Sequence, residues 1–127
     1  MAGIARLKRR AEFLRVADSR RKSVMPGLIL QARRRTTAAD GATEPPRIGF
    51  TASRKVGIAV DRNRARRRLR AAVDEVMPLH AALGHDYVVI ARAATVQRPF
   101  AALVGDLEAA LRRLGVYRVT PDGEAMD

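Results

Sequence analysis

The chain has 127 residues, no Cys and no Trp, and a formal net charge of +12 from 25 Lys plus Arg against 13 Asp plus Glu. Its length suits one domain with a modest core, and the absence of Cys excludes disulfides, thiolate metal sites and a cysteine nucleophile, which suits a reducing cytoplasm. No apolar run approaches the ~20 residues that span a bilayer, and the first residues lack the apolar segment of a secretory signal. We therefore expect a single cytoplasmic domain over residues 1–127, with an ordered core at about 7–115 and no membrane contact.

The first half of the chain predicts one helix followed by two strands. Apolar side chains at helical spacing predict a helix over about 9–20, which Met25-Pro26 separates from a strand at 27–32. Residues 36–46 are small and polar and are interrupted by Gly and Pro, so we expect a mobile loop. Alternating side chains at 47–53 predict a second strand, and we expect it to form a hairpin with the first.

The second half predicts a basic helix, a central strand and an apolar helix. Asp61 is placed to cap the amino end of a helix over 62–77 that ends at Pro78. The apolar run at 86–92 is typical of a central strand covered on both faces. Pro99 then opens a helix whose apolar side chains, beginning with Phe100, we assign to the core. This helix should end at Gly115, and we expect residues 116–127 to be frayed.

Together these elements predict an α/β (α+β) two-layer sandwich. About three helices should pack on one small mixed sheet, with room for a further short strand. The sequence sets no oligomeric state for the free protein.

Positive charge is concentrated in two segments of the chain. Residues 1–35 carry eleven basic and two acidic side chains and residues 53–70 carry eight and one, whereas residues 71–127 carry five and eight. Of the 25 basic residues 22 are Arg, whose planar guanidinium binds phosphate through paired hydrogen bonds. A helical wheel of 62–77 separates an apolar face from a basic one. This distribution favours one surface that binds a polyanion.

The sequence supplies no group of side chains suited to catalysis. His80 and His85 are five residues apart and match no zinc motif, so we expect surface histidines in a loop rather than a metal site. Neither a phosphate-binding glycine loop nor a nucleophile elbow is present. We therefore predict no catalytic residue, no metal ligand and no cofactor bound by the protein alone.

Residues 47–70 form a long ordered motif, RIGFTASRKVGIAVDRNRARRRLR. It resembles the signature of the protein subunit of bacterial ribonuclease P, in which a strand R-[IV]-G-[LF]-x-V-S-K-K leads through V-G-N-A-V into a helix that opens R-N-R-x-[KR]-R. Arg62, Asn63 and Arg64 match the R-N-R element. The flanks match as well, at the L-K-x-x-x-x-F-x-x-V pattern that begins at Leu7 and at the DYVVIAR segment over 86–92.

The resemblance covers about residues 7–114 and includes three departures. Ala17 stands where the family frequently has Phe, Ala52 stands where Val is common, and Ile58 stands where Asn is usual. The last of these lies in the turn before the basic helix, and the first removes an aromatic side chain.

The resemblance implies a subunit that binds a catalytic RNA and the 5′ leader of precursor tRNA, while the RNA performs Mg²⁺-dependent hydrolysis. It also implies a left-handed βαβ crossover, an exception to the usual handedness. The residues expected at the interface with the RNA subunit are Arg54, Lys55, Arg62, Asn63, Arg64, Arg66, Arg67, Arg68 and Arg70. The residues expected to line a groove in which leader nucleotides stack are Phe13, Phe50, Lys8 and Arg9. Plain core packing is the alternative for both Phe side chains.

Two other classes of protein are compatible with the composition. A ribosomal protein or a basic DNA-binding domain would show the same charge, and only the ordered motif separates it from a ribonuclease P subunit. An autonomous nuclease would cleave RNA without an RNA subunit, and the lack of acidic and histidine clusters makes it the weakest alternative.

Overall fold

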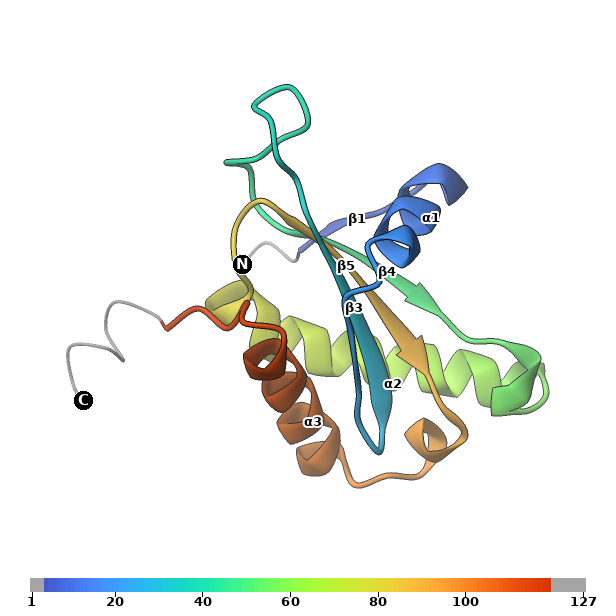
Figure 1. Cartoon of the computed structure of the whole chain (residues 1–127). Helices are drawn as coiled ribbons and strands as arrows, with labels where there is room; N and C mark the ends of the chain where they lie inside the picture. The colour runs from blue at the N-terminus through green and yellow to red at the C-terminus, as the bar shows by residue number, and fades with distance from the viewer. Residues whose placement is uncertain (1–3, 120–127) are drawn as a thin grey trace.

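The computed structural model describes residues 4–119, which form one mixed five-stranded sheet with three α-helices (Figure 1). The strand order is β1-β4-β5-β3-β2, and β5 pairs in parallel with β4 and antiparallel with β3. The predicted fold class is therefore confirmed. The strands are β1 (Ala5–Arg6), β2 (Lys22–Val24), β3 (Leu28–Arg34), β4 (Arg47–Thr51) and β5 (His85–Ala91), and the helices are α1 (Arg10–Asp18), α2 (Ala59–His80) and α3 (Phe100–Arg113).

The central position of β5 is confirmed, whereas the predicted hairpin between β3 and β4 is wrong. The apolar strand β5 enters between them, because its side chains need cover on both faces of the sheet. The hairpin that does form joins β3 to β2, a short strand whose position the sequence did not predict. The unit β4-α2-β5 is the expected βαβ crossover, and its left-handed sense stays a prediction from the resemblance.

The two faces of the sheet are covered unequally. Helices α2 and α3 pack on one face and enclose the main core, in which Leu30, Leu69 and Leu107 are fully buried. Helix α1 lies across part of the opposite face, where Val16 packs on Val88 (Figure 1). The remainder of that face is not covered by a helix, and it forms the groove described below.

Helix α2 is longer than predicted at both ends. It begins at Ala59, so Asp61 is its third residue and not its N-cap, although its carboxylate accepts the Ile58 backbone N–H at 3.3 Å. The helix also continues past Pro78, because a proline in the last turn removes a single N–H while the Ala81 N–H still reaches the Met77 carbonyl at 3.0 Å. The expected apolar face is confirmed, since its side chains Ala65, Leu69, Ala72, Val73 and Val76 are all buried.

Two further expectations about the periphery are corrected. Phe100 is 38% exposed and lies outside the core, because it occupies the first turn of α3, where its neighbours Pro99 and Ala101 also face solvent. Residues 116–119 are not frayed: Val116 is buried, and the Arg118 N–H donates to the His80 carbonyl at the end of α2. The rest of the predicted tail, 120–127, lies outside the described residues.

The loop over 36–46 is tied to the sheet by a buried arginine. The Arg35 side chain, which is 1% exposed, donates hydrogen bonds of 2.7–2.8 Å to the carbonyls of Gly41, Glu44 and Pro45. These hydrogen bonds satisfy three loop carbonyls that would otherwise lose their partner, while the mobility suggested by the composition of the loop stays a prediction.

Candidate nucleic-acid interface

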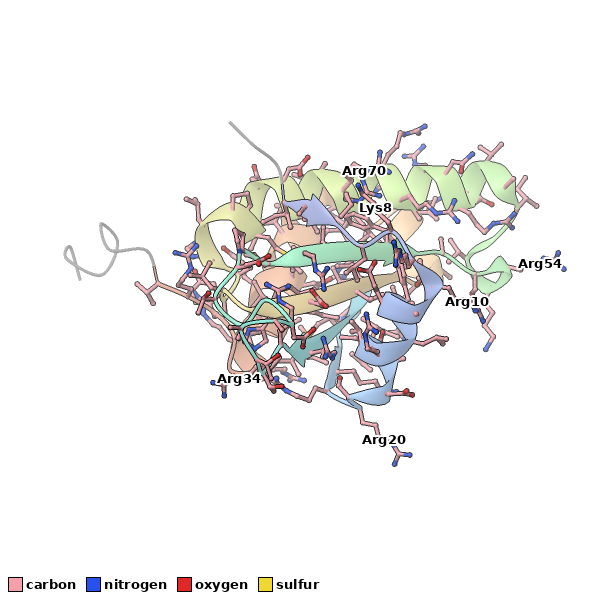
Figure 2. The ribbon with its side chains drawn as sticks, turned by 90° about the horizontal axis from the view of Figure 1, so that it is seen from above. Lys8, Arg10, Arg20, Arg34, Arg54 and Arg70 are labelled. Atoms are coloured by element: carbon pink, nitrogen blue, oxygen red, sulfur yellow. The ribbon has the colours of Figure 1, made fainter. Side chains whose placement is uncertain are left out.

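The exposed face of α2 presents the basic surface that the sequence predicted. Asn63, Arg64, Arg67 and Arg70 are exposed, and Arg62, Arg66 and Arg68 are partly buried. The remaining predicted contacts, Arg54 and Lys55, lie in the 3-10 turn just before α2 and are exposed. Figure 2 shows Arg54 projecting from that end of the molecule and Arg70 further along the helix. All nine predicted residues therefore lie on α2 or in the turn just before it, six of them exposed and three partly buried.

Most arginines on this surface are already held by other atoms of the chain. Arg62 donates to the Gly57 carbonyl at 3.0 Å, and Arg66 donates to the Asn63 side chain at 3.2 Å. Arg64 and Arg68 donate to carbonyls of the segment that follows β5. Within residues 4–119, Arg67 makes no hydrogen bond or ion pair through its side chain. A guanidinium has five N–H donors, so each arginine keeps donors for a phosphate.

Phe50 belongs to this side of the sheet and not to the groove predicted for it. Its ring is partly buried against the main core, and the guanidinium carbons of Arg6 and Arg70 lie 4.9 and 5.9 Å from the ring centroid. The ring therefore helps to orient Arg70 through a cation–π contact. Arg6 joins the basic surface as a residue that the sequence reasoning missed, because a two-residue strand such as β1 has no detectable periodicity.

The open part of the opposite face forms a groove whose floor crosses four strands. Thr51, Ile90, Ile29 and Val24 are aligned by the strand register, and all four side chains are partly or fully exposed. Adjacent to this row is a hollow of about 480 Å³, lined by Ile29, Ile90, Ser53, Lys55, Val56, Ala91, Arg92 and Ala93. The groove therefore combines an apolar floor with basic side chains at its rim, an arrangement that suits single-stranded nucleic acid.

Phe13 lies on the groove side of the sheet, so the structure separates the two Phe side chains that were expected together. Its ring packs directly over Gly49 and against the small cluster of Leu7, Val16 and Val88. Successive residues of a strand face opposite sides, which places Phe50 on the other face from the ring above Gly49. Lys8 and Arg9 are exposed just before α1, whose N-cap is Arg9, and Figure 2 shows Lys8 near Arg70.

A buried ionic cluster fixes α1 over the sheet. The carboxylate of Asp86 in β5 accepts hydrogen bonds from Arg35 at 2.5 Å and from Arg47 at 2.8 Å. Burial raises the pKa of Asp86, but the hydrogen bonds from Arg47 and Arg35 outweigh it and hold that pKa below its ordinary value. Arg47 also reaches Glu12 of α1 at 3.2 Å, and Glu12 caps the helix by accepting the Lys8 and Arg9 N–H groups. These two backbone hydrogen bonds lower the pKa of Glu12.

The histidines contact neighbouring aromatic rings and are not loop residues. His80 ends α2 and stacks on Tyr117 with ring centroids 4.5 Å apart, and His85 begins β5 and lies 5.9 Å from Tyr87. Burial lowers the pKa of His85. Across residues 4–119 no three His, Cys, Asp or Glu side chains form a group that could hold a metal ion. In the same part of the chain, no helix has both the length and the apolar character needed to cross a membrane.

A small α+β fold, a basic helix face and a separate groove with an apolar floor define a nucleic-acid-binding protein. The family model for ribonuclease P matches residues 1–115. The chain is 54% identical over 126 residues to the ribonuclease P protein component of Paramagnetospirillum magneticum, covering 99% of this chain and 94% of that protein. It is also 54% identical to the ribonuclease P protein component of Gluconacetobacter diazotrophicus, over 87% of this chain and 91% of that protein. This chain belongs to the ribonuclease P protein family.

The solved structures agree with this assignment. The ribonuclease P protein of Staphylococcus aureus is 25% identical and superposes with a TM-score of 0.71, covering 89% of this chain and 97% of that one. The ribonuclease P protein of Thermotoga maritima shares the fold, with a TM-score of 0.69 at 23% identity over 85% of this chain and 96% of that one. The protein is therefore the protein component of a ribonucleoprotein endoribonuclease that matures the 5′ ends of tRNA, and it works with an RNA subunit and a tRNA substrate.

Proposed function

We propose that the two faces of the sheet bind two different RNAs. The basic surface of α2 binds phosphates of the catalytic RNA, and the groove beside α1 binds the single-stranded 5′ leader of precursor tRNA. The observation that carries this division is the placement of Phe13 and Phe50 on opposite faces of β4. Phosphate contacts supply affinity that is independent of sequence, whereas an apolar floor with an aromatic ring offers a surface for stacking bases.

The chain's own side chains bind and orient RNA and do not cleave it. Within residues 4–119 the two buried carboxylates are Asp86, which pairs with Arg35 and Arg47, and Asp106, which pairs with Arg98. We propose that hydrolysis and the required Mg²⁺ belong to the RNA subunit. We also propose a cytoplasmic location, because a chain without Cys suits a reducing compartment.

The first experiment measures cleavage of a precursor tRNA at low Mg²⁺ by the catalytic RNA with the protein, by the RNA without it, and by the protein alone. We expect stimulation only in the combined reaction. Absence of stimulation would indicate a general RNA-binding protein, and cleavage by the protein alone would show that it contains an active site.

A matched pair of variants tests the division between the two faces. Phe13→Leu should weaken the affinity of the holoenzyme for precursor tRNA by about fivefold or more, because stacking on one base contributes about 1–3 kcal/mol and each 1.4 kcal/mol is tenfold. Phe50→Leu should leave the contribution of the leader unchanged and should weaken binding of the RNA subunit through Arg70. Equal effects of both variants on leader binding would contradict the assignment.

A further inference from the structure

The segment between β5 and α3 connects the two RNA-binding surfaces. It contains a 3-10 turn at Ala93–Val96, and Arg92 and Ala93 form part of the hollow beside the groove. The same segment lies against α2, on the side where the basic surface begins. It is therefore a wall of the leader groove that contacts the helix proposed to bind the RNA subunit.

Two arginines of α2 hold this wall through its backbone carbonyls. Arg68 donates from Nε to the Thr95 carbonyl at 3.0 Å and from Nη2 to the Arg98 carbonyl. Arg64 donates from Nε to the Val96 carbonyl at 3.1 Å. Carbonyl oxygens at the end of a short 3-10 turn have no N–H partner within the turn. The two guanidinium groups supply the hydrogen-bond donors that these oxygens would otherwise lack.

The wall is in turn hydrogen-bonded to the turn between β2 and β3, at the far edge of the groove floor. The Thr95 hydroxyl, which is fully buried, donates to the Gly27 carbonyl at 2.6 Å, and Arg92 donates to the Met25 carbonyl at 2.7 Å. Asp106 of α3 accepts both the Gly27 N–H at 2.9 Å and the Arg98 side chain at 2.6 Å. A continuous set of hydrogen bonds therefore joins the basic face of α2 to the floor of the groove.

We propose that Arg64 and Arg68 are positioning residues for the leader groove, in addition to any contact they make with RNA. Each guanidinium keeps free N–H donors, so a phosphate of the RNA subunit can bind one edge while the other edge holds the wall. Binding of the RNA subunit then restrains the same side chains that fix the groove. Lysine cannot substitute here, because an ammonium lacks the planar fork that serves a carbonyl and a phosphate together. This inference rests on the proposed binding of the leader in the groove.

The test compares Arg68→Lys with Arg67→Lys in the holoenzyme reconstituted with the cognate catalytic RNA. Both variants keep the charge and lie on the same helix, but only Arg68 donates to the wall. The measured quantity is the ratio of affinities for a precursor tRNA with a long leader and for one with a single-nucleotide leader. Arg68→Lys should lower this ratio by about fivefold to tenfold, as expected for the loss of a net hydrogen bond, and Arg67→Lys should leave it unchanged.

Thr95→Val provides a second variant that does not alter the charged surface. Valine removes, at nearly constant volume, both the hydrogen bond that the Thr95 hydroxyl donates to the Gly27 carbonyl and the one that it accepts from the Arg92 N–H. It should therefore also lower the leader ratio while leaving the affinity for the RNA subunit unchanged. Equal ratios for Arg68→Lys, Arg67→Lys and the unsubstituted protein would overturn the proposal. A ratio of one in the unsubstituted holoenzyme would instead contradict leader binding itself, and this inference would fall with it.

Discussion

Replacing Asp86 by Asn should cost more stability than any other conservative change in the ionic cluster. The side chains of Asp86 and Arg35 are 2% and 1% exposed, and Arg47 and Arg33 lie within 2.8 and 3.6 Å of the same carboxylate. Asparagine keeps the shape of the side chain and removes its charge. It leaves the buried Arg35 guanidinium without a counterion and turns an amide N–H₂ toward donors, and breaking a buried pair in this way costs about 3 kcal/mol or more.

The matched control is Asp40→Asn, because Asp40 also pairs with Arg33. That pair has a distance of 2.8 Å, but its side chains are 21% and 29% exposed, so its loss should cost at most about 0.5–1 kcal/mol. Urea unfolding followed by circular dichroism measures both variants. With an m-value of about 1.5 kcal/mol/M, the midpoint should fall by about 2 M for Asp86→Asn and by less than about 0.7 M for Asp40→Asn. Equal shifts would refute the view that burial makes this cluster the anchor of α1 and of the 36–46 loop.

Three further outcomes are expected. The pKa of Asp86 in the folded state lies below its ordinary value of 3.8. The ionised carboxylate therefore stabilises the fold above that pH, and this stabilisation is lost as the pH falls through the folded pKa. The unfolding free energy should fall less steeply with decreasing pH for Asp86→Asn than for the unsubstituted protein. Gly49→Ala would place a Cβ 2.5 Å from Cζ of Phe13, which should cost about 1–3 kcal/mol in urea unfolding and weaken binding of long-leader precursor. Arg67→Ala should reduce the slope of log K for the RNA subunit against log salt by about 0.7–0.9, with an unchanged thermal midpoint.

The sequence predicted those elements whose side-chain pattern depends on burial. The apolar stripe of α2, the continuous apolar run of β5 and the spacing in α3 each reflect one large contact with the core, and all three are confirmed. The strands β1 and β2 have two and three residues, too few for a period to appear. The order of strands was missed because a hairpin between neighbours is the usual connection, and here the longer βαβ route returns β5 between β3 and β4.

The sequence predicted which residue types form the candidate site, but not how they are divided between the two faces of the sheet. The register of one strand places Gly49 and Phe50 on opposite faces, yet which face α1 would cover depends on tertiary contacts that no local pattern encodes. The hydrogen bonds of Arg64 and Arg68 were hidden for the same reason, since their acceptors are backbone carbonyls about 30 residues away. A count of basic residues on a helical wheel cannot distinguish a free arginine from one that holds a loop.

The hydrogen bonds within the basic surface also bear on how it binds RNA. Ordering a long side chain on binding costs about 0.5–1.5 kcal/mol, and this cost is smaller for a side chain already held in the free protein. Arg62, Arg64 and Arg68 are fixed by carbonyls of the chain, and the ring of Phe50 lies beneath Arg70. These guanidinium groups can therefore contribute more of their phosphate affinity than that of Arg67, which makes no side-chain hydrogen bond within residues 4–119. With the binding proposed above, these hydrogen bonds, and not the number of charges alone, would suit this face of α2 to one structured RNA.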